Sequence, residues 1–322
     1  MNYIGIDGGG TKTKATVMDS HGNVLGIGSS GPSSIDTVSF DESLTNILQA
    51  INNTNVDLHK DTIDSIFMGL GGISCEEDEI RVANNFIKNS NIVLPTTKVV
   101  AKNDAYNAFG SGLPLDKSGC ILIVGTGSIA FGKCNNLSHR AGGYSYKEGE
   151  PGSSYALGKQ VIGLISKYHD SRITDSSLTK DVTEYLNIKT TVDIIRLAEE
   201  YYADRTKTAS LAKFVTKHAL LNDSYAISII ENATDELALM VEAVDKTIKL
   251  DNKKLAIIGS LGNDKYFFKI LESKIKQIDT NYKVFESILD PVIGACIIAL
   301  RADNIELSED KINKLKEISN NI

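Results

Sequence analysis

Apolar residues along the first hundred positions follow the periods of strands and helices in turn. Three strand-like runs are followed by an amphipathic helix, a buried strand, a second helix and another strand. The predicted segments are 3–6, 14–18 and 24–28 as strands, 41–51 as a helix, 65–70 as a strand, 80–88 as a helix and 98–101 as a strand. Because short turns join the first three strands, they should form an antiparallel meander.

The opening pattern returns after residue 120. Strand-like runs at 121–124 and 129–133 flank a second glycine-rich turn, and the segment from 153 to about 250 has mostly helical spacing. Short strands at 255–258 and 283–285, a helix from Pro291 and an amphipathic helix over 308–322 complete the pattern. An internal duplication with a nucleotide between the halves would explain this recurrence of strand, glycine turn and strand.

Length and composition predict two globular domains. The chain has 322 residues and a mass of 34.9 kDa, whereas single hydrophobic cores stop growing at about 250 to 300 residues. Hydrophobic residues make up 42% of the chain and charged residues 23%, which is typical of a soluble globular protein. We expect a first lobe of residues 1–115, completed by the C-terminal helix 303–322, and a second lobe of residues 116–302 with a helical insertion.

Charge and cysteine usage narrow the functional class. The net charge of −7 is spread along the chain without basic clusters, so we expect no nucleic-acid partner. No apolar stretch approaches about 20 residues and no signal-like segment opens the chain, so we expect a cytoplasmic protein without membrane association. The four cysteines include no C-x-x-C pair, which argues against zinc and against a disulfide framework. Cys120 and Cys134 lie in apolar runs, where buried thiols are expected.

The first glycine-rich turn has the chemistry of a polyphosphate grip. Its glycines let backbone amides approach an anion, its threonines offer hydroxyl donors and its lysine offers positive charge. A P-loop needs Lys directly after the last glycine, and both a P-loop and a dinucleotide-binding turn open a helix, whereas a strand follows here. The candidate ATP-binding residues of this turn are Gly9, Gly10, Thr11, Lys12 and Thr13.

Asp7 ends the first strand directly before these glycines. From this position a carboxylate can hold Mg²⁺, usually through retained water. The alternative is a hairpin turn in which the acid and the glycines serve only the backbone geometry. The second turn, Gly125-Thr126-Gly127-Ser128, has Val124 in place of the acid. The sequence therefore predicts one metal site, at Asp7, and two phosphate grips.

Asn103 and Asp104 follow the strand at 98–101, where a carboxylate can face a cleft. A kinase needs a base that accepts the proton of the attacking hydroxyl, and Asp104 is the candidate. The alternative is that Asp104 caps a helix that begins at Ala105. The presence of two glycine turns in the same chain favours the catalytic interpretation.

Several of these motifs, in this order, resemble the N-acetylglucosamine kinase and BadF/BadG/BcrA/BcrD ATPase group along nearly the whole chain. They are Asp7-Gly-Gly-Gly-Thr-Lys-Thr, Asn103-Asp104-Ala105, Gly125-Thr-Gly-Ser and Gly142-Gly143-Tyr144. The resemblance implies an α/β protein of two RNase H-like domains, the actin/hexokinase ATPase fold, with ATP and an amino sugar in a cleft between them. It also implies adenosine contact at Gly259, Ser260 and Leu261. We further expect a homodimer.

Two departures from the group concern the sugar. The group usually has Gly-Asp-Glu-Gly-Ser after the double glycine, whereas this chain has Gly149-Glu-Pro-Gly-Ser, in which Glu150 can still accept hydrogen bonds from sugar hydroxyls. The group commonly offers an Asn after the third strand, where this chain has serines and an aspartate. The resemblance thus implies sugar contact by Ser33, Ser34, Asp36, Asn103, Asp104, Thr126, Gly142, Gly143, Tyr144 and Glu150.

Together with the glycine turns and Asp104, the resemblance implies a kinase that uses ATP and Mg²⁺ to phosphorylate the C6 hydroxyl of an N-acetylated amino sugar, in cell-wall sugar recycling. The altered loop leaves room for a substituted sugar, and the chain resembles bacterial kinases of both N-acetylmuramic acid and N-acetylglucosamine. One alternative is a glucosamine kinase. Another is an activator ATPase of 2-hydroxyacyl-CoA dehydratases, whose iron-sulfur cluster needs cysteine thiolates. A regulatory or chaperone-like ATPase is the third.

Overall fold

The computed structural model describes residues 1–59, 62–145, 147, 150–174 and 176–322, so that Gly149 of the sugar motif lies outside the described residues. The chain divides into two units, the first made of Met1–Asp116 and Ser287–Ile322 and the second of Lys117–Glu286. The C-terminal part of the first unit thus begins at Ser287, and not at 303 as expected. Helix α11 (Pro291–Arg301) belongs to the first unit because its apolar side chains pack with Tyr3, Met18 and Phe67.

The first unit is built on a five-stranded sheet of the order β3-β2-β1-β4-β5. β1 pairs antiparallel with β2, and β2 with β3, whereas β1, β4 and β5 are parallel. The expected meander is therefore present. The strands are β1 (Asn2–Gly8), β2 (Thr13–Asp19), β3 (Val24–Ser30), β4 (Ile63–Leu70) and β5 (Lys98–Asn103).

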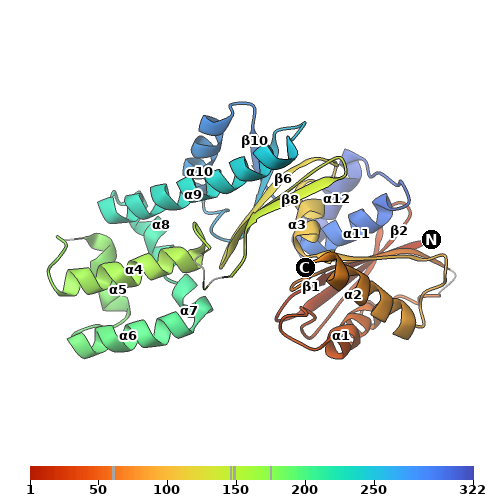
Figure 1. The fold of residues 1–322 in the computed structure, drawn as a ribbon, viewed down its shortest axis with the longest axis horizontal. Coiled ribbons are helices and arrows are strands. Elements are labelled where there is room, and N and C mark those ends of the chain that lie inside the picture. Colours follow the sequence, from red (N-terminus) through yellow and green to blue (C-terminus); the bar gives the residue numbers. More distant parts are fainter. Residues whose placement is uncertain (60–61, 146, 148–149, 175) are drawn as a thin grey trace. The chain divides into compact units, whose positions relative to one another are not determined.

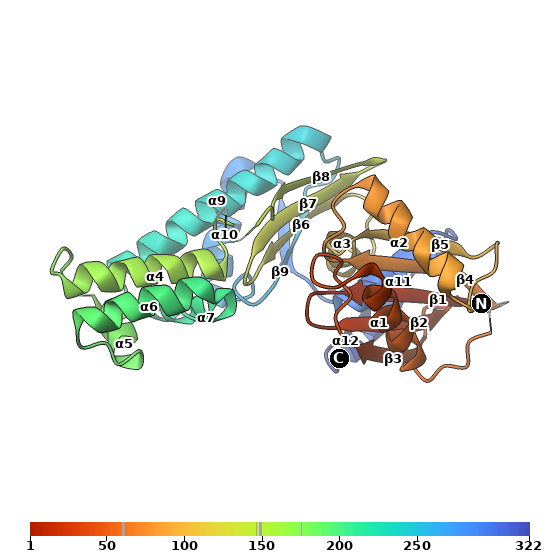
Figure 2. The same ribbon diagram turned by 60° about the horizontal axis from the view of Figure 1, so that its bottom comes forward.

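Helices cover both faces of this sheet (Figures 1 and 2). Ile4 and Ile6 of β1 share a core with helices α1 (Phe40–Asn52) and α2 (Glu76–Asn89). Tyr3, which alternates with them along the strand, shares the opposite core with α11 and α12 (Glu309–Ser319). Helix α3 (Ala105–Gly112) packs on α11. The alternation along β1 thus reflects burial on both faces.

The second unit repeats this sheet order, because β8-β7-β6-β9-β10 corresponds to β3-β2-β1-β4-β5. The strands are β6 (Gly119–Val124), β7 (Ser128–Cys134), β8 (Leu137–Gly142), β9 (Lys254–Ile258) and β10 (Lys283–Glu286). β6, β7 and β8 are antiparallel, and β9 and β10 run parallel to β6. The repeat agrees with the duplication inferred from the two glycine turns. β8 was not predicted, because its residues are largely polar and half-exposed.

Helices α4 to α8 form the insertion between β8 and the long helix α9 (Figure 1). Helix α9 packs on β7 and β8, and α10 packs on α9. Among the described residues, none of the helices is long and apolar enough to cross a membrane. The helices are α4 (Ser154–His169), α5 (Ser177–Tyr185), α6 (Thr191–Ala203), α7 (Arg205–Ala209), α8 (Ala212–Leu220), α9 (Ser224–Ile248) and α10 (Lys265–Ile278).

Candidate active site

Asp7 lies at the end of β1, and one of its oxygens, Oδ1, accepts a hydrogen bond from Asn107 Nδ2 at 2.8 Å. Burial raises the pKa of the Asp7 carboxyl to about 6; the Asn107 hydrogen bond opposes this shift, while the charges of Asp104 and Asp290 add to it. Lys14, the cross-strand partner of Asp7, lowers the same pKa. Asp7 is thus a desolvated acid that a bound cation would stabilise.

Asn107 is a site residue that the sequence did not reveal. It is fully buried, and its Nδ2 also donates to the backbone oxygens of Ile6 at 3.1 Å and Gly69 at 3.0 Å. Its Oδ1 is buried and has no hydrogen-bond partner among the residues that the structure describes. Asn107 therefore ties the ends of β1 and β4 to Asp7. The signal in the sequence that could have identified Asn107 is a polar residue within a short, largely apolar helix.

Lys14 is held by an aspartate from far along the chain. Lys14 Nζ donates to Asp290 Oδ2 at 2.6 Å, and the two side chains are only 12% and 16% exposed. Asp290 is also the N-cap of α11, since its Oδ1 accepts from the backbone N–H of Val292 at 3.0 Å. The pair fixes one positive and one negative charge near Asp7, with opposite effects on its pKa. The packing of α11 on the first sheet brings the pair together.

The first glycine turn is stabilised by backbone contacts with the loop after β3. Gly9 N–H donates to Lys12 O at 3.0 Å, and Gly9 O accepts from the N–H groups of Ser33 and Ser34, both at 3.1 Å. Thr11 and Lys12 are exposed at the turn. These two residues are accessible to a ligand, as the polyphosphate grip requires.

Thr13 and Ser33 do not have the orientation that we expected for ligand contacts. Both are fully buried, and the Thr13 hydroxyl lies 2.7 Å from Ser33 Oγ and 2.7 Å from Gly31 O. A Cβ on Gly8 would lie 2.2 Å from Ser33 Oγ, so the serine fills the space beside this glycine. The physical reason is that both hydroxyls satisfy each other in the interior, where they hold the loop on the sheet.

Asp104 precedes α3 but does not cap it. Its side chain makes no capping hydrogen bond, and the residue is exposed. Asn103 takes the role instead, because its Oδ1 accepts from Ala105 N–H at 3.0 Å while its Nδ2 donates to Ile73 O at 2.9 Å. The capping alternative for Asp104 is thus not supported, and the amide of Asn103 is engaged in local structure.

Ser34, Asp36 and Asp104 belong to one region of the first unit. Ser34 Oγ donates to Asp36 Oδ1. A Cβ on Gly71 would lie 2.7 Å from Ser34 Oγ and 3.7 Å from Asp104 Oδ2, so both side chains face this glycine. The structure thus brings together candidate sugar-binding residues from the loop after β3 and the candidate catalytic base after β5.

The Asp7 region has the donor chemistry of a magnesium site. Among the residues that the structure describes, no group of three or more His, Cys, Asp or Glu could hold a metal ion. Mg²⁺ in phosphoryl-transfer sites, however, usually binds one or two carboxylates together with substrate phosphates and water. Asp7 supplies one carboxylate. Burial, with a smaller contribution from the charges of Asp104 and Asp290, raises its pKa, and a bound cation would offset this destabilisation of the charged form.

In the second unit, the turn from Gly125 to Ser128 is bonded to the start of α4. Gly125 O accepts from Ser154 N–H at 2.8 Å, and Thr126 O accepts from Tyr155 N–H at 3.3 Å. Ser128 Oγ donates to Pro151 O at 2.7 Å. The carbonyls of the turn are thus occupied by the helix, and the Ser128 hydroxyl is engaged as well.

The segment expected near adenosine lies against this turn. Gly259 has a φ of 110°, and a Cβ there would lie 2.5 Å from Val124 O. Gly262 N–H donates to Val124 O at 3.0 Å. Ser260 is exposed, whereas Leu261 is 5% exposed and packs in the core. Ser260 is therefore more accessible to a ligand than the Leu261 side chain.

The double glycine reaches the same turn from β8. Gly142 pairs with Ile129 of β7, and both Gly142 and Gly143 have left-handed backbone conformations, with φ of 72° and 68°. Tyr144 is 67% exposed, and the Arg140 guanidinium lies 4.9 Å from the centre of its ring. The left-handed backbone conformation thus explains why glycine occupies both positions. The Tyr144 side chain is accessible to a ligand.

Glu150 is bound by an arginine that the sequence analysis missed. Arg205 Nη2 donates to Glu150 Oε2 at 2.5 Å, next to Gly127 of the second turn. Arg205 lies in the helical insertion, where neither spacing nor a motif marks it. Glu150, which we expected to contact sugar hydroxyls, therefore has a charged partner in this structure.

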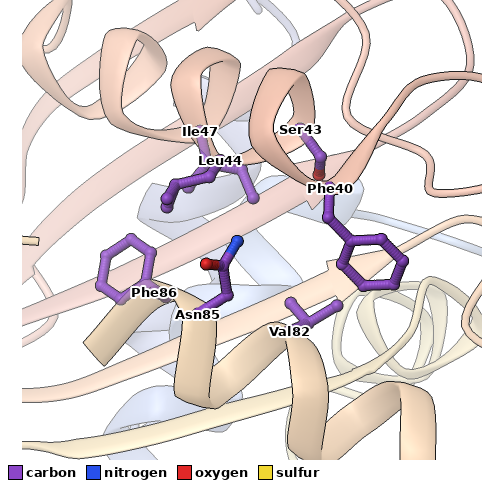
Figure 3. A pocket seen from close by; sticks show the side chains of 7 residues that line it. All are labelled: Phe40, Ser43, Leu44, Ile47, Val82, Asn85 and Phe86. Carbon is purple, nitrogen blue, oxygen red and sulfur yellow. The ribbon is translucent and has the colours of Figure 1, made fainter. Parts of the chain in front are cut away.

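A cavity between α1 and α2 is too small for a sugar or a nucleotide (Figure 3). Its volume is about 10 Å³, which is about the space of one water molecule. The side chains that line it are Phe40, Ser43, Leu44, Ile47, Val82, Asn85 and Phe86. It is a packing defect between two helices and not a candidate site.

The chain is similar in sequence to known proteins over most of its length. The chain is 28% identical over 318 residues to an N-acetyl-D-glucosamine kinase of Dictyostelium discoideum. It is 29% identical over 310 residues to an N-acetylmuramic acid/N-acetylglucosamine kinase of Clostridium acetobutylicum. Each alignment covers 93% of this chain and 98% of the relative.

Solved structures confirm the fold class. A proposed N-acetylglucosamine kinase from Chromobacterium violaceum has a TM-score of 0.69 at 20% identity, with 93% of this chain and 98% of that chain covered. A ROK family glucokinase from Streptomyces griseus has a TM-score of 0.56 at 13% identity, with 94% and 100% covered. The two five-stranded units are thus RNase H-like domains of the actin/hexokinase ATPase fold.

Family membership follows from the sequence match, which extends over both units. Residues 4–299 match the sequence model of one family. This range includes both glycine turns, Asp7, Asp104 and Asp290. The chain belongs to the BadF/BadG/BcrA/BcrD ATPase family.

Proposed function

We propose that this protein is an ATP-dependent kinase that phosphorylates the C6 hydroxyl of N-acetylglucosamine and of N-acetylmuramic acid. The observation that carries the proposal is the exposed Asp104, which does not cap its helix and faces the same glycine as Ser34. The names of two relatives, which are kinases of these sugars, support it. Such a kinase would act in the cytoplasm, in the recycling of cell-wall sugars.

In the proposed reaction Asp104 accepts the proton of the C6 hydroxyl. The C6 oxygen forms a bond to the γ-phosphorus, the bond from that phosphorus to the β–γ bridging oxygen breaks, and ADP leaves. Transfer is direct, without a phosphoenzyme, and positioning supplies most of the rate.

The phosphates would be held by the backbone amides of the two glycine turns, with the exposed Thr11 and Lys12 beside the first of them. Asp7 would hold Mg²⁺, which, when bound, offsets the negative charge of the phosphates. Thr13 and Ser33 hold the loop instead of contacting the ligand. Asp36 would hydrogen-bond the sugar, and the buried Ser34 would position it by donating to its carboxylate. Ser260 is exposed and lies on the segment proposed to contact adenosine.

A panel of amino sugars with Mg-ATP tests the proposal. We expect ADP release with N-acetylglucosamine and N-acetylmuramic acid, and a product whose fragmentation places the phosphate on C6. Strong turnover of N-acetylglucosamine with near-zero turnover of N-acetylmuramic acid would remove the second substrate. Preference for glucosamine would favour a glucosamine kinase, and a blank panel would exclude sugar kinase activity.

The activator ATPase alternative is disfavoured by the state of the cysteines. Cys120 and Cys134 are buried in the core of the second unit, and burial raises the pKa of the Cys120 thiol. Iron-sulfur clusters bind thiolates, which such an environment opposes. Protein purified without air should be colourless; absorption from an iron-sulfur cluster would revive this alternative.

A further inference from the structure

The ion pair between Arg205 and Glu150 has no role in the proposed phosphoryl transfer. The arginine is the first residue of α7, and its Nη2 donates to Glu150 Oε2 at 2.5 Å. The side chain of Glu150 is only 10% exposed, whereas that of Arg205 is 38% exposed. The glutamate is thus held inside, and the arginine remains accessible to a ligand.

The pair lies directly on the second glycine turn. A Cβ on Gly127 would be 2.4 Å from Arg205 Nη2 and 2.5 Å from Glu150 Oε2. Gly127 is not among the described glycines with positive φ, so backbone conformation does not require a glycine there. The charged pair instead fills the space beside this glycine, so that a side chain there would displace the ends of Arg205 and Glu150.

The backbone at Glu150 is held in a conformation that a side chain disfavours. Its φ is 35°, in the left-handed region. Such conformations persist where surrounding contacts impose them, and they concentrate at ligand sites. Here the conformation accompanies a glutamate side chain that faces Arg205 beside the turn.

We propose that Arg205, positioned by Glu150, binds an oxyanion of a ligand at the second glycine turn; this inference rests on the proposed kinase function. A guanidinium presents its N–H donors in a fork that matches phosphate and carboxylate oxygens. The proposed reaction brings two such groups, the phosphates of ATP and the lactyl carboxylate of N-acetylmuramic acid. N-acetylglucosamine carries neither, so it serves as the neutral reference ligand.

Equilibrium titration of the full chain distinguishes the two oxyanions. Wild type and Arg205→Ala are titrated separately with Mg-ATP, N-acetylmuramic acid and N-acetylglucosamine. We expect Arg205→Ala to weaken the binding of an anionic ligand about 10- to 100-fold, because it removes a charge-assisted hydrogen bond. Weakening of ATP assigns the phosphate to Arg205, and weakening of N-acetylmuramic acid assigns the carboxylate. The affinity for N-acetylglucosamine should change little.

Two further variants separate recognition from structure. Arg205→Lys keeps the charge and loses the fork, so it should recover part of the lost affinity. Arg172→Ala is the matched control, because Arg172 makes an exposed pair with Asp170 at the opposite end of α4 from the turn. It should bind all three ligands as wild type does. A thermal unfolding curve shows that each variant is folded.

Two results would overturn the inference. One is unchanged binding of both anionic ligands by folded Arg205→Ala, and the other is equal weakening of all three ligands, which indicates a structural role. Failure of the kinase assignment is a separate outcome. If wild type phosphorylates no amino sugar while ATP binding still depends on Arg205, the proposed function fails and the oxyanion site stands.

Discussion

Burial of Asp7 couples the stability of the protein to pH. Its pKa is raised from 3.8 to about 6 in the folded protein. Between these two values the folded state binds more protons than the unfolded state, so in the metal-free protein this group makes stability fall as the pH rises. Above about pH 6 the carboxylate is charged in both states, and the full destabilisation is present.

Asp7→Asn should therefore stabilise the metal-free protein while it impairs the use of Mg-ATP. At about pH 7.5 we expect a gain of up to about 3 kcal/mol, and the gain should shrink as the pH is lowered toward about 4. Urea unfolding at several pH values measures it. A variant less stable than wild type at neutral pH would contradict the charge argument, and a normal metal dependence would contradict the metal role.

Asp104→Asn should abolish phosphoryl transfer while the protein stays folded. The amide cannot accept the hydroxyl proton, so we expect kcat to fall by about 100-fold or more. Binding of ATP and sugar should persist, and the variant should stay folded, because the Asp104 side chain makes no capping hydrogen bond to α3. Steady-state kinetics and equilibrium titration check this; an active variant would refute the assignment of the base.

Asp223 provides the matched control at the residue scale. It caps α9, with Oδ1 accepting from the N–H groups of Tyr225 at 3.0 Å and Ala226 at 3.1 Å. Its Oδ2 also accepts from Ser176 Oγ at 2.7 Å. Asp223→Ala should cost about 2 kcal/mol of stability with kcat retained. Comparison of the two variants thus separates the catalytic role proposed for Asp104 from the structural role of Asp223.

At the scale of elements, α11 approaches α3 closely enough that only glycine fits between them. A Cβ on Gly294 would lie 2.3 Å from Asn107 O and 2.4 Å from Ser111 N, both of which are backbone atoms. A Cβ on Gly110 would in turn lie 2.4 Å from Gly294 O. This contact sets the position of the helix that carries Asn107.

Gly294→Ala should therefore destabilise the protein by about 2 kcal/mol or more, since backbone would have to move. Gly163→Ala in α4 is the control, because a Cβ there meets nothing within 4 Å. It should stabilise the protein by up to about 1 kcal/mol through helix propensity. Chemical unfolding of both variants compares them; equal effects would mean that the close approach is not important.

At the scale of the whole molecule, the first unit is discontinuous in sequence and the second is continuous. Tyr3, Met18 and Phe67 are buried in a core to which α11 and α12 contribute. A fragment of residues 1–116 would leave this apolar face exposed to water.

We accordingly expect residues 117–286 to unfold cooperatively as an isolated fragment, and residues 1–116 to need residues 287–322 for a fixed tertiary structure. Near-ultraviolet circular dichroism and thermal unfolding of the fragments test this. Addition of the 287–322 peptide should restore the signal of the first fragment. Cooperative unfolding of 1–116 alone would show that the C-terminal helices are dispensable.

The elements and motifs with a local signature could be predicted from the sequence. The strands around both glycine turns, the amphipathic helices, the fold class and the family were correct, because periodicity and glycine turns are properties of neighbouring residues. β8 was missed because its alternation is weak. The roles of Asp7 and Asp104 stay predictions, although the structure removes the capping alternative for Asp104.

By itself the sequence thus determined the duplicated strand-turn-strand pattern, with Asp7 at the end of the first strand and Asp104 after the fifth. Only the tertiary structure decided that Thr13 and Ser33 face each other and that α11 belongs to the first unit. It also joined Asn107 to Asp7 and Arg205 to Glu150. These contacts link residues distant in the chain, and packing across many positions sets them, so no local pattern encodes them.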